Sequence, residues 1–251
     1  MGGWIEVVVT PDGSSDDSSL SSPALQSGEA SPGPRRTSRQ RLLTAIGLLL
    51  VGAGLVVLGW VAWQLWGTNW ISQRHQAEAV ESVRRQWANG QDSAHVDAGV
   101  VTAVIRIPRF GKDYEVPVLE GTSDEALASG FGHFSDTARP GRVGNYALAG
   151  HRITHGQPLR EMPELRPGDK VIVETRRATY TYVLDTPGDG LIVPFTATWV
   201  LDPLPTNPDG GVQPDQAPGQ RLITLTTCSE LFHTDNRMIA FGHLDSVSRR
   251  R

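Results

Sequence analysis

Residues 223–228, Ile223-Thr224-Leu225-Thr226-Thr227-Cys228, decide how the rest of this sequence is interpreted. The run alternates apolar and β-branched residues, which is typical of a strand with one buried face. It ends on the only cysteine in the 251 residues. A cysteine at a strand end can be a nucleophile presented by a rigid scaffold, but free cysteine is also among the most buried residue types. From this run alone, both interpretations stay open.

A cation and several histidines are available as partners for Cys228. Arg237 comes nine residues later, at the start of a second strand-like segment, 236–244. A thiol near a permanent cation is a candidate reactive centre, and a cysteine nucleophile also needs a group that exchanges protons. His151 follows a buried-looking strand and a glycine, which favours it over His155 as the active-site histidine. The other histidines fit a helical segment, loops or a strand interior, and are His75, His95, His133, His233 and His243.

Composition and periodicity predict the fold class. The net charge of -4 does not suggest a nucleic-acid partner, and one cysteine rules out an intramolecular disulfide. Seventeen prolines and 27 glycines indicate many turns. From residue 99 onward, short strands alternate with turns, which predicts a mainly β domain: a closed barrel of about eight strands with short helices. The expected strands are 100–107, 114–119, 143–149, 170–175, 178–184, 223–228 and 236–244, with a helix at 123–130 capped by Ser123 and residues 191–200 ambiguous.

The N-terminal third predicts a membrane anchor. Residues 1–41 are rich in Ser, Asp, Gly and Pro, which is typical of a disordered tail. Residues 42–66 contain no charged side chain, and 25 helical residues span roughly 37 Å, enough to cross a bilayer. Four arginines precede this span, so the positive-inside rule predicts a cytoplasmic N-terminus and an extracellular C-terminal part. Residues 67–98 are interpreted as an extracellular helical stalk before a catalytic domain at 99–251. Four tryptophans at helical spacing indicate an interfacial anchor: Trp60, Trp63, Trp66 and Trp70.

Three motifs together resemble those of the sortase family. Residues 224–228 are similar to the family's TLxTC motif, residues 149–151 to its histidine motif, and Arg237 follows on the next strand as in that family. The resemblance covers about residues 99–247. Segments 145–156 and 237–244 are most similar to class E, the housekeeping type of actinobacteria. Classes C and D are the alternatives, although the sequence lacks the Asp-Pro-Trp type of lid motif usual in class C.

The resemblance implies a cysteine transpeptidase. Cys228 would attack the Thr-Gly carbonyl of an LPxTG-like or LAxTG-like sorting signal and form a thioester, which an amine of a cell-wall precursor would resolve. His151 would exchange protons, and Arg237 would hold the substrate backbone and stabilise the oxyanion. Thr227 would be a substrate-binding residue that helps to position Arg237 or the oxyanion. The partners would be surface proteins that carry a sorting signal, the peptidoglycan amine and the cell membrane. Class E prefers Ala at the signal's second position, and Tyr146 is the residue expected to recognise it, although ordinary core packing is nearly as good an interpretation.

Two other functions remain as alternatives, and no cofactor is expected. The same cysteine would suit a hydrolase that uses water as the acceptor, and a non-catalytic barrel that binds wall peptides would also fit the anchor. Some sortases use calcium, but the acidic residues available here match no calcium loop and are interpreted as a solvated edge. These residues are Glu115, Glu120, Asp124 and Glu125.

Overall fold

The computed structural model describes residues 38–63, 68–228 and 235–250. The first helix, α1 (Ser38–Ala62), is long and apolar enough to cross a membrane, and its candidate span, Ser38–Val61, has no buried residue. It is the one such helix in the described part of the chain. The predicted single apolar helix is therefore confirmed, and it begins earlier than expected, at Ser38. Of the tail predicted at 1–41, residues 38–41 belong to α1, and residues 1–37 lie outside the described residues.

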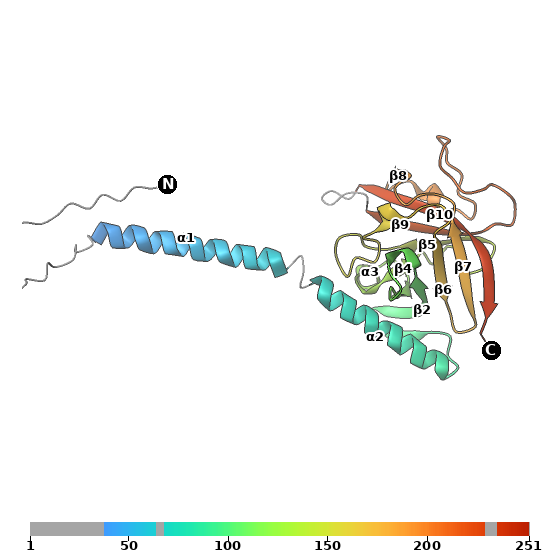
Figure 1. The fold of residues 1–251 in the computed structure, drawn as a ribbon, viewed down its shortest axis with the longest axis horizontal. Coiled ribbons are helices and arrows are strands. Elements are labelled where there is room, and N and C mark those ends of the chain that lie inside the picture. The colour runs from blue at the N-terminus through green and yellow to red at the C-terminus, as the bar shows by residue number, and fades with distance from the viewer. Residues whose placement is uncertain (1–37, 64–67, 229–234, 251) are drawn as a thin grey trace, which may run out of the picture. The chain divides into compact units, whose positions relative to one another are not determined.

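The remaining elements are mostly strands (Figure 1). The strands are β1 (Ala94–Val96), β2 (Gly99–Arg106), β3 (Val116–Glu120), β4 (Phe131–His133), β5 (Gly144–Ala149), β6 (Lys170–Glu174), β7 (Ala178–Leu184), β8 (Leu191–Pro194), β9 (Arg221–Cys228) and β10 (Asn236–Arg249). The helices are α2 (Thr68–Ala88) and α3 (Asp124–Ser129), with 3₁₀ turns η2 (Pro108–Phe110), η3 (Met162–Glu164) and η4 (Thr198–Leu201).

Eight of these strands close into a mixed barrel. They pair in the order β2-β3-β4-β5-β9-β10-β7-β6, and β6 pairs back with β2. The β3–β4 and β5–β9 pairs are parallel and the others are antiparallel. Alternate residues of the central strands fill the interior, as the period of two in a strand requires. Examples are Tyr146, Leu148, Ile223, Leu225, Met238 and Ala240. The predicted closed barrel of about eight strands is confirmed.

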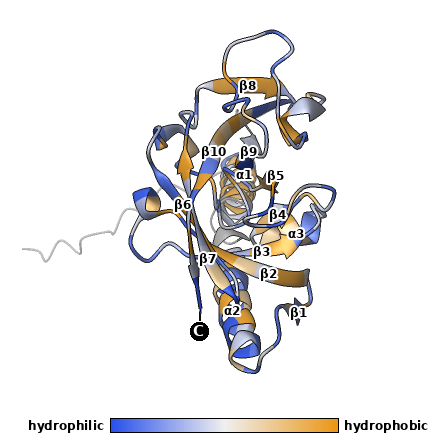
Figure 2. Ribbon diagram, turned by 90° about the vertical axis from the view of Figure 1, so that its right-hand side faces the viewer, coloured by the Kyte–Doolittle hydropathy of each residue, from blue (hydrophilic) through white to orange (hydrophobic). Residues whose placement is uncertain are grey.

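Helix α2 packs directly on the barrel. Four of its residues recur at helical spacing and are buried against β2 and β3, in one cluster with Val101, Val104 and Leu119. Figure 2 shows the apolar residues of α2 as orange bands between hydrophilic ones. The stalk interpretation did not foresee this packing, because helical periodicity shows that a face is apolar but not what covers it. The four residues of α2 are Ala79, Val80, Val83 and Trp87.

One short segment is stabilised by a local interaction and another by contacts with a distant strand. The predicted helix at 123–130 is α3, and the Ser123 hydroxyl accepts a hydrogen bond from the Ala126 amide at 3.3 Å. The ambiguous segment 191–200 forms β8 and η4. Strand β8 pairs with the first half of β10, and Val193 and Val200 pack with residues of β10 in a small hydrophobic cluster.

Candidate active site

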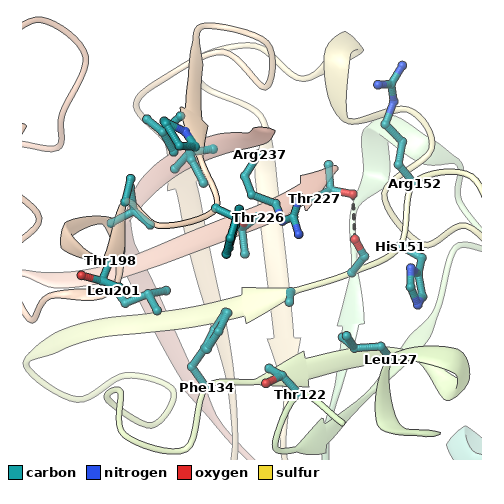
Figure 3. Close-up of a pocket in the computed structure, with 18 of the residues that line it drawn as sticks. Thr122, Leu127, Phe134, His151, Arg152, Thr198, Leu201, Thr226, Thr227 and Arg237 are labelled. Atoms are coloured by element: carbon teal, nitrogen blue, oxygen red, sulfur yellow. Dashed lines mark hydrogen bonds between the residues drawn. The ribbon is translucent and has the colours of Figure 1, made fainter. Parts of the chain in front are cut away.

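Two hydrogen bonds join the ends of the parallel strands β5 and β9. The Gly150 amide donates to the Thr226 carbonyl at 3.1 Å, and the Thr227 hydroxyl donates to the Gly150 carbonyl at 2.7 Å (Figure 3). Gly150 packs closely, because a Cβ atom there would lie 3.1 Å from the Phe131 ring. His151 is the next residue, so the backbone that carries its imidazole is fixed beside the end of β9.

Strand β10 brings Arg237 to the same place. In the antiparallel β9–β10 pair, Arg237 is the direct partner of Cys228. The Arg237 guanidinium donates to the Asn236 carbonyl at 3.1 Å. The backbone of Cys228 is thus located at the end of β9, while its side chain lies outside the described part of the structure.

His151, Thr227 and Arg237 line one cavity of about 580 Å³ (Figure 3). Apolar side chains from several elements form much of its wall, as in most sites that bind a ligand through a few polar groups. The cavity extends along β8 and η4 to the start of α3. The structure therefore brings three of the residues singled out from the sequence to one cavity, while their roles stay a prediction. The apolar wall includes Leu127, Phe134, Val193, Phe195, Val200 and Ile239.

The surroundings of His151 favour its neutral form. Burial lowers the pKa of the imidazole most, the neighbouring His155 lowers it further, and Asp124 opposes both by raising it. The His151 and His155 rings lie 4.8 Å apart. A neutral imidazole, which can accept a proton, is therefore favoured at this position of the cavity wall.

Helix α2 supports the segment that carries these two histidines. The Gln76 side chain donates to the His155 carbonyl at 3.3 Å and is itself only 5% exposed. His155 and Gly156 both have positive φ, at 55° and 77°. A Cβ atom at position 156 would lie 2.4 Å from Gln76 Nε2. Sequence reasoning missed Gln76; the signal available was a polar residue on the apolar stripe of α2.

Tyr146 does not join this cavity. It lies in the barrel interior, 2% exposed, and its ring is 4.9 Å from that of His133. The alternation in β5 explains this, because Tyr146 and Leu148 point into the barrel while Ala149 lines the cavity.

The other candidate histidines lie elsewhere. His133 is buried, with its ring nitrogens 3.0 Å from Glu120 Oε2 and 3.1 Å from the Ala138 carbonyl, which makes it part of the barrel framework. His243 contacts Asp185 at 2.7 Å, and His75 and His95 are exposed. His233 lies outside the described residues.

Two of the four acidic residues considered for calcium are engaged with basic side chains. Glu115 lies 2.7 Å from Arg84, and Glu120 pairs with His133. Asp124 and Glu125 occupy the first turn of α3, where the helix dipole favours carboxylates. Within the described ranges, no three His, Cys, Asp or Glu side chains are grouped so as to hold a metal ion.

Comparison with known proteins gives one consistent result. A model of the sortase domain matches residues 105–245. Sortase SrtE1 of Streptomyces coelicolor is 36% identical over 211 residues, which are 80% of this chain and 56% of that protein, so the chain spans little more than half of that relative. The solved structure of sortase E from Streptomyces avermitilis is 39% identical with a TM-score of 0.52, over 61% of this chain and 93% of that one. Sortase E1 of S. coelicolor, solved with a tripeptide in its active site, is 34% identical with a TM-score of 0.52, over 62% and 94%.

Proposed function

The chain belongs to the sortase family, and on that premise we propose that it is a class E cysteine transpeptidase anchored by α1. It would cleave an LPxTG-like or LAxTG-like sorting signal between Thr and Gly and transfer the protein to a cell-wall amine. The arrangement that carries this proposal is the shared cavity of His151, Thr227 and Arg237, beside the strand position of Cys228. The tripeptide bound in the active site of the S. coelicolor relative supports a peptide as the ligand.

In the first half-reaction, the Cys228 sulfur attacks the threonine carbonyl carbon and its proton passes to His151. The lowered pKa of His151 supports this step, because a neutral imidazole is required to accept the proton. The oxyanion that forms is stabilised by the Arg237 guanidinium, a permanently charged planar donor. Collapse of this intermediate breaks the Thr-Gly bond, and the imidazolium of His151 protonates the departing amine. A threonyl thioester remains on Cys228.

In the second half-reaction, an amine attacks the thioester and loses a proton to His151. The new amide forms as the Cys228 sulfur leaves and regains its proton. The Thr227 hydroxyl, which is bonded to the Gly150 carbonyl, acts as a positioning group that holds the His151 backbone against β9. We place the catalytic part outside the cell and the N-terminus in the cytoplasm, in keeping with the arginines that precede α1.

The test uses the full chain in neutral detergent with a labelled LAxTG peptide, with and without hydroxylamine. We expect cleavage, a mass adduct of the acyl fragment on Cys228 and an amine-dependent product. A Cys228→Ala variant should give neither product nor adduct. Product formation that does not depend on the added amine would identify a hydrolase instead. Cleavage retained by the Cys228→Ala variant would exclude both the cysteine transpeptidase and the cysteine hydrolase. Replacing LAxTG by LPxTG in the same assay determines the preference at the second position and tests the class E assignment.

A further inference from the structure

A second cavity, of about 420 Å³, lies at the other end of β5 from His151. It shares no lining residue with the first cavity. Its walls come from the start of β2 and β5, the β6–β7 hairpin, and the segments before β1 and β5. The transpeptidase mechanism makes no use of it.

Positive charge predominates in this second cavity. Four arginines and two carboxylates line it: Arg139, Arg142, Arg176, Arg177, Asp92 and Glu120. Asp92 forms ion pairs with Arg176 and Arg177, and the Glu120 carboxylate contacts the His133 ring. Within the described ranges, the guanidinium groups of Arg139 and Arg142 make no hydrogen bond or ion pair. The positive charge of Arg139 nevertheless contributes to lowering the pKa of Glu120. The lining of the cavity therefore includes two exposed guanidinium groups that an anion can bind.

A buried hydroxyl points to the same conclusion. Tyr146 lines this cavity while only 2% exposed, and no described residue provides a hydrogen-bond partner for its hydroxyl. Buried hydroxyls are nearly always hydrogen bonded, so this one requires an explanation. Tyr182, the other large tyrosine in the core, has a partner, because its hydroxyl accepts a hydrogen bond from the Gly141 amide at 2.7 Å. Burial raises the pKa of Tyr146, which keeps its hydroxyl protonated and able to donate.

We propose that the second cavity binds a phosphate group, carried by a soluble phosphate ester or by a lipid headgroup. A guanidinium group can bind two phosphate oxygens at once, and Arg139 and Arg142 contribute two such groups to the lining of the cavity. Tyr146 and Thr102 also line this cavity, and the proposal assigns their hydroxyls as donors to further phosphate oxygens. The Thr175 hydroxyl is not among these donors, because it already donates to the Ala178 carbonyl at 2.8 Å. A phosphate group has enough oxygens and charge to satisfy both kinds of donor at once.

The experiment is a calorimetric titration of the full chain in neutral detergent micelles. One arm adds glycerol 3-phosphate and the other adds short-chain phosphatidylglycerol. We expect saturable binding in at least one arm, weakened by added salt because exposed charges are screened. Arg139→Gln combined with Arg142→Gln should weaken binding by about tenfold or more, and Tyr146→Phe by roughly threefold to tenfold. Binding in the first arm alone identifies a soluble ester, and binding in the second alone identifies a lipid headgroup.

Two controls separate this site from general charge and from catalysis. The double variant Lys112→Gln/Arg160→Gln removes the same charge at exposed positions outside the cavity and should bind as the parent does. Cys228→Ala should also bind normally, so the result does not depend on the proposed transpeptidase activity. The proposal is overturned if neither ligand binds at millimolar concentration, or if the Arg139/Arg142 variant binds unchanged. Succinate that binds as tightly as glycerol 3-phosphate would overturn the assignment to phosphate.

Discussion

His151 differs from the other described histidines in what surrounds it. Burial and a second imidazole 4.8 Å away lower its pKa, while Asp124 raises it. His133 is instead tied to Glu120 and a carbonyl, and His243 to Asp185. His151 is half-buried, lines the cavity and has no such carboxylate or carbonyl partner among the described residues. These surroundings support our proposal that it exchanges protons with the substrate.

The two ionisable neighbours of His151, His155 and Asp124, should move the pH profile in opposite directions when they are replaced. The cysteine–histidine pair should give a bell-shaped profile of kcat/KM, and its lower apparent pKa should follow His151, whose pKa is already depressed. His155→Gln removes a group that disfavours the imidazolium, so the acid limb should move to higher pH. Asp124→Asn removes a group that favours the imidazolium, so the same limb should move to lower pH. Shifts in the same direction would contradict this electrostatic account.

The two buried tyrosines should respond differently to loss of their hydroxyls. Without added phosphate, Tyr146→Phe removes a hydroxyl with no partner among the described residues, and we expect stability to be unchanged or to rise by up to about 1 kcal/mol. Tyr182→Phe leaves the part-buried Gly141 amide without its acceptor and should cost about 1–2 kcal/mol. Thermal unfolding of the two variants beside the parent measures both effects. A lower midpoint for the Tyr146 variant than for the Tyr182 variant would contradict the assignment.

Helix α2 acts on the site at the scale of an element. Its side chain Gln76 donates a hydrogen bond to the carbonyl of His155, in a segment where three successive residues, 155–157, have positive φ. Such a backbone persists only where its surroundings hold it, so the bond to Gln76 is a positioning contact for the two histidines.

Removing this contact should lower activity without unfolding the protein. Gln76→Ala deletes one side-chain hydrogen bond, and we expect kcat/KM to fall by roughly threefold to tenfold. Amide exchange of residues 151–157 should become faster in this variant, which a role confined to helix packing would not produce. Gln73→Ala is the matched control, because Gln73 lies on the same helix and is exposed. Equal activity in the two variants would show that the contact does not position the histidines.

Elements set by local interactions were the ones predicted best. The α3 cap needs only Ser123 and the amide three residues on, and the period of two in β7 identified its bounds at Ala178–Leu184. Strand β8 was ambiguous because its four residues are fixed by pairing with β10, far along the chain. The placement of Tyr146 could not be inferred, since five of the six residues of β5 are buried and alternation does not tell which face lies inside a barrel. The motifs located His151 and Arg237, but no motif marks Gln76.

At the scale of the whole molecule, the hydrophobic core of the barrel domain includes residues that precede residue 99, the predicted start of the domain. Val83 and Trp87 of α2 and Ala94 of β1 share a buried cluster with residues of β2 and β3. Strand β1 also pairs with β2. The packing unit around the site therefore includes α2 and β1 together with the barrel.

Truncation should reveal this unit. A fragment of residues 68–251 retains α2 and β1, whereas a fragment of residues 99–251 exposes Val101, Val104 and Leu119 to water. Exposing a buried Val or Leu costs about 1.5–3 kcal/mol, so the loss is comparable with the total stability of many domains. We expect the shorter fragment to melt at least about 10 °C lower or to aggregate, as followed by circular dichroism. Equal melting temperatures would show that α2 contributes nothing to the fold.

The order of the strands along the chain also determines which strand pairs must form before the site exists. The Thr227 to Gly150 hydrogen bond joins residues 77 positions apart, and Arg237 lies on the last described strand. Such distant pairing forms late in folding. Until β9 has paired with β5 and β10 has paired with β9, His151, Thr227 and Arg237 cannot line one cavity. A polypeptide in which these strand pairs have not yet formed therefore lacks the proposed site, even when every residue of the site is present.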